Sequence, residues 1–164
     1  MYEMKEEYKI GIDQIDEQHK KLFELADKAY TLLKDEFAID KYDKIIHIMD
    51  ELKDYTIFHF KSEEEYMKSI NYKRLFTQKV EHDKFIKNLE EIDYKNIDEN
   101  QDESLIKLLN FLNDWLTEHI LKTDKLIGEW YNYNKNVLFF YYNYFAVRVR
   151  YRNLTLFFII NLKM

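Results

Sequence analysis

Histidines and acidic residues stand at helical spacing in four separate stretches of this chain, and their side chains are of the kind that bind metal ions. The set is His19, His59, Glu63, His82, His119 and Asp124, with Gln78 one helical turn before His82. Residues four apart lie on one face of a helix, so His59 and Glu63 can converge on one ion or bridge two neighbouring ions. Imidazole and carboxylate donors without thiolate suit iron, zinc or copper. These residues therefore predict a metal site.

The number of donors predicts two ions. Six or seven donors exceed what one ion needs, and carboxylates bridge two ions while imidazoles fill terminal positions. Glu63 and Asp124 are the expected bridges. A single histidine on an apolar face is more often a hydrogen-bonded core residue. Burying four histidines and two carboxylates without compensation would be very costly, however, and a metal is the usual compensation. His47, rotated about 120° from the stripe of His59, is expected to be peripheral.

Long helices are expected to position these donors. The chain has no proline and only two glycines, and its segments are rich in Leu, Ile, Lys and Glu, which favours helix over strand. Apolar residues recur with helical period, and each predicted helix turns at least one donor toward its apolar face. The predicted helices span residues 16–37, 40–69, 72–92 and 102–126. Short connections make neighbouring helices antiparallel, so the expected fold is an all-α, up-down-up-down four-helix bundle.

The spacing of His119 and Asp124 needs a local departure from the α-helix. Five residues turn a regular helix about 140° away from alignment, so both side chains reach one site only at a frayed helix end or a π-bulge.

Composition excludes several other classes of site and partner. With no cysteine, the chain has no disulfide, thiolate metal site or thiol nucleophile. A net charge of −6 argues against nucleic acid as a partner. The start, MYEMKEEYKIGID, lacks the basic and apolar regions of a secretion signal. We expect a cytoplasmic protein.

The last 34 residues differ from the rest, so the expected organisation is a bundle over 1–130 and an extension of unknown structure over 131–164. The extension has five basic residues and no acidic one. Its uncharged runs, 137–147 and 154–162, are shorter than the roughly 20 residues of a spanning helix. Three interpretations stay open: a strand-like hairpin, an interfacial anchor that meets anionic lipid, and a non-homologous extension from a shifted reading frame or missing stop.

Four motifs, in order, resemble the hemerythrin family and its single-domain bacteriohemerythrins. They are IGIDQIDEQHKKLF at 10–23, HFKSEEEYM at 59–67, EHDKF at 81–85 and WLTEHILKTD at 115–124, and the resemblance covers about residues 8–130. It implies a non-haem diiron centre, with two Fe ions, that binds dioxygen reversibly. By position, His19 and His59 would serve the iron with the open site, His82 and His119 would serve the other iron, and Glu63 and Asp124 would bridge.

The sequence departs from the family at Gln78, where members normally carry a histidine. Gln78 could ligate through its side-chain oxygen, could hold a water that ligates, or could leave the second iron loosely bound. The expected function is dioxygen binding for carriage, storage or sensing, without enzymatic activity. The alternative is a hemerythrin-like bundle with an impaired metal site, acting as a binding, structural or iron-holding protein. A diiron oxidase is disfavoured, because such enzymes use carboxylate-rich sites with Glu-x-x-His pairs.

Overall fold

The part of the chain that the structure describes consists of helices joined by short connections. The computed structural model describes the backbone of residues 2–92 and 94–161. Side chains are described for residues 2–92 and 97–144. The elements are η1 (Glu6–Tyr8), α1 (Asp13–Lys34), α2 (Tyr42–Ser69), α3 (Leu75–Glu90), α4 (Tyr94–Glu99), α5 (Gln101–His119), the π-helical turn η2 (Ile120–Asp124) and α6 (Lys125–Asn161). No strand forms among the described residues. The predicted all-α class is confirmed.

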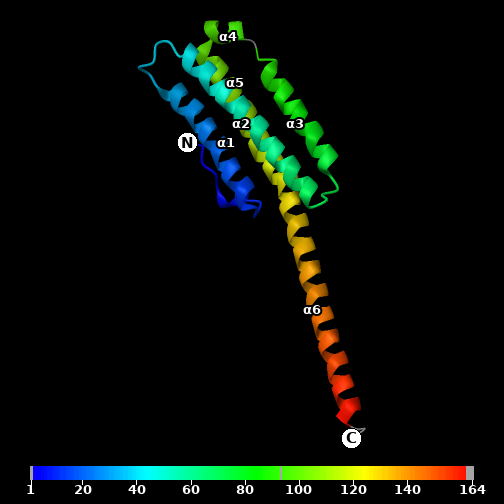
Figure 1. Ribbon diagram of the computed structural model, residues 1–164. Helices are drawn as coiled ribbons and strands as arrows, with labels where there is room; N and C mark the ends of the chain where they lie inside the picture. Colours follow the sequence, from blue (N-terminus) through cyan, green and yellow to red (C-terminus); the bar gives the residue numbers. More distant parts are fainter. Residues whose placement is uncertain (1, 93, 162–164) are drawn as a thin grey trace. The chain divides into compact units, whose positions relative to one another are not determined.

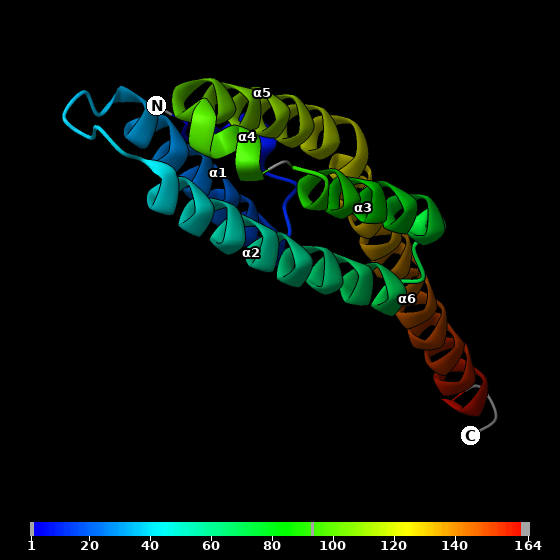
Figure 2. The ribbon, with the colours of Figure 1, turned by 90° about the horizontal axis from the view of Figure 1, so that it is seen from above.

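Helices α1, α2, α3 and α5 form an antiparallel four-helix bundle (Figures 1 and 2). Helix α2 packs against α1 and α3, and α5 packs against α1. The ring closes between α3 and α5, where Phe85 and Phe111 stack with their centroids 4.9 Å apart. The predicted up-down-up-down bundle is confirmed, and the bounds of α1, α2 and α3 lie within a few residues of the predicted ones.

The start of α1 is fixed by a carboxylate that reaches backward. Asp16 accepts hydrogen bonds from the backbone N–H of Ile10, at 2.7 Å, and of Gly11, at 3.1 Å. Gly11 has a φ of 80°, a conformation that glycine adopts without strain. The N-cap residue of α1 is Ile12, and Asp16 holds the preceding segment against the start of the helix.

The polar stretch between α3 and α5 contains a helix that the sequence did not predict. Helix α4 spans Tyr94–Glu99, and Ile97 on it is only 2% exposed. Burial of this one apolar side chain fixes a short helix in a stretch whose composition is typical of a loop.

The last helical stretch does not end near residue 126 as predicted, since α6 continues to Asn161. The strand-like hairpin considered for the extension is therefore wrong. Internal contacts group the chain up to Gly128 in one unit and the chain from Glu129 onward in another. None of the described helices is both long and apolar enough to cross a membrane. The boundary at residue 130 stays a prediction.

Candidate metal centre

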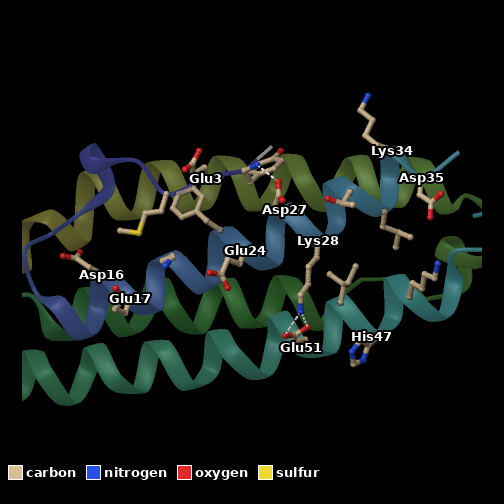
Figure 3. A pocket seen from close by; sticks show the side chains of 18 of the residues that line it. Glu3, Asp16, Glu17, Glu24, Asp27, Lys28, Lys34, Asp35, His47 and Glu51 are labelled. Atoms are coloured by element: carbon tan, nitrogen blue, oxygen red, sulfur yellow. Dashed lines mark hydrogen bonds and ion pairs between the residues drawn. The ribbon is translucent and has the colours of Figure 1, made fainter. Parts of the chain in front are cut away.

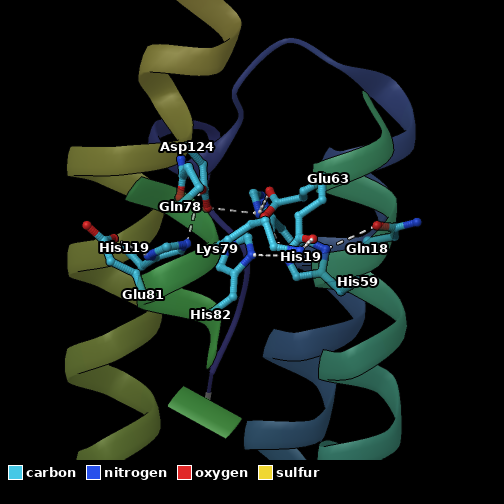
Figure 4. A network of polar contacts seen from close by, with 11 residues as sticks. Gln18, His19, His59, Glu63, Gln78, Lys79, Glu81, His82, His119 and Asp124 are labelled. Atoms are coloured by element: carbon cyan, nitrogen blue, oxygen red, sulfur yellow. Dashed lines mark hydrogen bonds and ion pairs between the residues drawn. The ribbon is translucent and has the colours of Figure 1, made fainter. Parts of the chain in front are cut away.

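The bundle brings all the predicted donor residues together in its interior, where Figure 4 shows them. Each comes from the apolar face of its helix, with η2 supplying the last. None is more than 5% exposed; they are His19, His59, Glu63, Gln78, His82, His119 and Asp124. The sequence therefore places seven polar side chains where helices ordinarily bury hydrocarbon.

Within this cluster, two groups of side chains have the spacing of metal ligands, and both include Glu63. One group is His19, His59 and Glu63, and the other is Glu63, His82 and His119. Glu63 Oε1 lies 3.6 Å from His19 Nε2, and Glu63 Oε2 lies 3.3 Å from His82 Nε2. Glu63 Oε2 also lies 3.7 Å from His59 Nε2. This one carboxylate therefore faces histidines of both groups.

The carboxylate of Asp124 also faces histidines of both groups, with one oxygen toward each group. Its Oδ2 lies 3.4 Å from His19 Nε2, and its Oδ1 lies 3.2 Å from His119 Nε2. The π-helical turn η2 begins directly after His119 and ends at Asp124. Because a π turn accommodates one extra residue, Asp124 returns to the side of the helix that carries His119. The predicted π-bulge is confirmed.

Most of the nitrogens and oxygens inside the cluster have no hydrogen-bond partner among the residues that the structure describes. The buried unpartnered atoms are both ring nitrogens of His19, both oxygens of Glu63, Gln78 Oε1, Asp124 Oδ2 and the Nε2 atoms of His59, His82 and His119. Buried polar atoms are rarely left unpaired, because each costs about 1–3 kcal/mol. Such a set of buried nitrogens and oxygens is typical of side chains that bind a metal ion.

Burial and mutual contacts also shift the pKa values of these groups. Burial lowers the pKa of His59 to about 4, which keeps its imidazole neutral. Burial alone would lower the pKa of His19 as well, but the facing Asp124 and Glu63 raise it to about 9. Burial would raise the pKa of Glu63, but His59, His19 and His82 hold it well below its usual range. The carboxylate is thus ionised, as a metal ligand must be.

Three polar residues outside the cluster hold the outer nitrogens of its histidines. Gln18 Oε1 lies 3.1 Å from His59 Nδ1, and Gln18 Nε2 donates to Ser62 Oγ at 3.2 Å, which orients the amide. Glu64 Oε1 lies 3.2 Å from His82 Nδ1. Glu81 Oε2 lies 3.2 Å from His119 Nδ1. In each case Nδ1 is occupied, so Nε2 is free to face the interior.

The sequence analysis missed these three residues, although each is adjacent in sequence to a predicted donor. Gln18 precedes His19, Glu64 follows Glu63, and Glu81 precedes His82. Each of them contacts a histidine on a different helix. Gln18 on α1 holds a histidine of α2, Glu64 on α2 holds one of α3, and Glu81 on α3 holds one of α5. We call these three residues the outer ring.

Gln78 occupies the interior one turn before His82 and is 1% exposed. Its Nε2 donates a long hydrogen bond of 3.4 Å to Asp124 Oδ1. Its Oε1 has no partner. The amide therefore lies next to Asp124 Oδ1, the oxygen that also faces His119.

Aromatic rings cover the side of the cluster formed by α3 and α5. Phe60 stacks on the ring of His82 with centroids 3.9 Å apart, and Trp115 stacks on His119 at 4.3 Å. These rings fix the planes of the two imidazoles and separate them from bulk water.

A groove of about 1390 Å³ along the N-terminal segment, α1 and α2 contains none of the predicted donors (Figure 3). Acidic and basic side chains alternate along it, including Lys28 paired with Glu51. His47 lies in its lining and is exposed, so the prediction that His47 is peripheral is confirmed.

Comparison with known proteins gives a consistent result over residues 10–131, which match the family described as Hemerythrin HHE cation binding domain. The chain is 53% identical over 125 residues to a bacteriohemerythrin of Clostridium acetobutylicum, covering 76% of this chain and 97% of that protein. It is 34% identical to a bacteriohemerythrin of Methylococcus capsulatus, covering 74% and 89% of the two chains. It is 28% identical to a hemerythrin-like protein of Naegleria gruberi, covering 70% and 81%.

Proposed function

Because the chain belongs to the hemerythrin family, we propose that it binds dioxygen reversibly at a non-haem diiron centre, for oxygen carriage, storage or sensing. The observation that carries the proposal is the set of buried, unpartnered donor atoms in the bundle interior. Four imidazoles and two carboxylates, all buried, are the donor set that an iron pair needs without any thiolate. The residues therefore fit the metal that the family implies.

The proposed ligands divide according to the two groups described above. His19 and His59 would serve one iron, and His82 and His119 the other. Glu63 and Asp124 would bridge the pair. Each carboxylate contacts histidines of both groups, which supports this role. Two bridging carboxylates contribute two negative charges in the interior, and ferrous ions would offset them.

The chain's own residues would prepare the site for dioxygen. A pair of ferrous ions held there would supply the two electrons that reversible dioxygen binding requires. The outer ring holds three imidazoles with Nε2 inward, so little reorganisation is needed when ions enter. Phe60 and Trp115 exclude water from one side of the site.

Gln78 would complete the second half of the site through its side-chain oxygen. The buried Oε1, which has no hydrogen-bond partner among the described residues, supports this role. An amide oxygen is a weaker donor to Fe(II) than imidazole nitrogen. That weakness motivates the alternative function, a binding, structural or iron-holding bundle whose metal site is impaired. The substitution Gln78→His should then markedly increase iron retention, and unchanged retention would count against the alternative.

We propose no enzymatic activity for this site. We also propose that the protein is cytoplasmic, because a chain without cysteine suits a reducing compartment. Consumption of an added reductant or hydrocarbon with dioxygen would argue instead for an oxidase.

The test is anaerobic loading with Fe(II), followed by desalting and exposure to air. We expect two irons per chain and a visible absorption that appears with dioxygen and disappears when dioxygen is removed. His59→Ala should lose both signals, whereas His47→Ala, which changes an exposed histidine in the groove, should retain them. Iron-loaded protein that stays colourless in air would refute dioxygen binding.

A further inference from the structure

The two halves of the proposed diiron site differ in their donors. His19 and His59 both offer imidazole nitrogen to one half. The other half has His82 and His119, but Gln78 presents an amide oxygen there, with no partner at Oε1. Since an amide oxygen is a weaker donor than imidazole nitrogen, the third side chain of this half contributes less to ion binding than a histidine at residue 78 would.

The outer-ring residues also differ between the two halves. On the half with Gln78, both imidazoles have a carboxylate at Nδ1, Glu64 for His82 and Glu81 for His119, each at 3.2 Å. On the other half, the partner of His59 is the neutral amide of Gln18. The Nδ1 of His19 has no hydrogen-bond partner among the described residues. Carboxylates therefore contact only the imidazoles of the half whose third side chain is an amide.

A carboxylate behind an imidazole strengthens that imidazole as a ligand. It accepts the Nδ1 proton, fixes the tautomer that leaves Nε2 free, and makes Nε2 more basic toward the ion. Its negative charge also attracts the ion through the ring. A neutral amide fixes the tautomer but does not add the charge.

We propose that Glu64 and Glu81 compensate for the amide at Gln78, by making His82 and His119 stronger ligands on that half of the site. The inference rests on the proposed diiron centre, and it assigns both glutamates as positioning residues, not ligands. Glu64 is expected to have the larger effect, because its side chain is only 21% exposed. Lys79, 2.8 Å from its other oxygen, fixes its orientation but offsets part of its charge. Glu81 is 41% exposed, so solvent screens its charge more.

The test is a comparison of Glu64→Gln and Glu81→Gln in two backgrounds, the natural chain and Gln78→His. Each chain is loaded anaerobically with Fe(II) and titrated with a ferrous chelator, which gives the affinity of each ion separately. In the natural background, Glu64→Gln should weaken one of the two ions by about 10–100-fold, as removal of such partners usually does. Glu81→Gln should weaken the same ion by less.

The Gln78→His background distinguishes compensation from general support. With a third imidazole restored, the loss caused by Glu64→Gln should become several-fold smaller. An equal loss of iron affinity in both backgrounds, or no loss in the natural one, would overturn the inference. If the natural chain still bound two irons, the proposed function would remain. A natural chain that retains no iron would overturn both.

Two controls keep the result interpretable. Glu65→Gln removes the same charge from an exposed neighbour of Glu64 and should leave both affinities unchanged. Melting of the metal-free variants should match that of the natural chain, because both replaced carboxylates are partly exposed and glutamine has the same size. A change in affinity without a change in metal-free melting is then an effect on the ion.

Discussion

Replacing Gly128 with alanine tests the close approach between the N-terminal segment and the first turn of α6. A Cβ at residue 128 would lie 2.0 Å from the carbonyl oxygen of Ile10 and 3.0 Å from its carbonyl carbon. An ordinary carbon–oxygen contact is about 3.3 Å, so one backbone must move by more than about 1 Å. Movement is resisted, because Asp16 holds the N–H groups of Ile10 and Gly11.

Two opposing terms set the magnitude for Gly128→Ala. Alanine is favoured over glycine inside a helix by about 1 kcal/mol. Overpacking against a fixed neighbour costs about 1–3 kcal/mol, and a backbone held on both sides belongs at the upper end. The net expectation is a loss of about 2 kcal/mol in the free energy of unfolding. For a chain of this length that corresponds to a melting temperature lower by about 4–8 °C.

The assay is thermal and urea unfolding of the metal-free chain, followed by circular dichroism. Gly11→Ala is the matched control: its Cβ meets nothing within 4 Å, but its φ of 80° is strained for alanine, at a cost of about 1 kcal/mol. Gly128→Ala should therefore be the more damaging change. Helix propensity alone predicts the opposite sign for residue 128. A Gly128→Ala chain as stable as the natural one, or more stable, would refute the close approach.

Three further predictions concern the site and the chain's organisation. Glu63→Ala should abolish retention of both ions after desalting, since both groups share Glu63; retention of one ion would contradict a shared bridge. The free energy of unfolding of the metal-free chain should be greatest near pH 6.5. The contribution of His59 is present above its unfolded pKa of 6.5 and is lost as pH falls through about 4. The contribution of His19 is present below 6.5 and is lost as pH rises through about 9; urea unfolding across pH that gave a flat profile would exclude both shifts. A chain ending at Trp130 should fold and load iron as the full chain does, and loss of its helical circular dichroism would contradict the boundary at residue 130.

Sequence periodicity was sufficient for the bundle, because each long helix buries a regular apolar stripe. It also indicated that His119 and Asp124 need either a frayed helix end or a π-bulge between them, and the structure shows that the π turn forms. Helix α4 was missed because one buried side chain, Ile97, outweighs the loop-like composition around it.

The outer ring could not be predicted in the same way. Its contacts join residues of different helices, and they depend on how far each helix is rotated against its neighbour. The sequence places Glu81 about 100° from His82 on one helix, which makes Glu81 a poor ligand. Only the packing of α3 against α5 shows that it instead contacts His119.

The outer ring also links the assembly of the bundle to the assembly of the site. Each of its residues lies on one helix and orients a histidine on the next, in the order α1 to α2, α2 to α3 and α3 to α5. A helix that unfolds or slips would therefore remove its own donor and also release the donor of the following helix. Local unfolding of α2 would disturb both halves of the site, because it would remove His59 and Glu63 and release His82. Ions bound at the site would therefore stabilise the packing of neighbouring helices, and the metal-free bundle should open locally more easily.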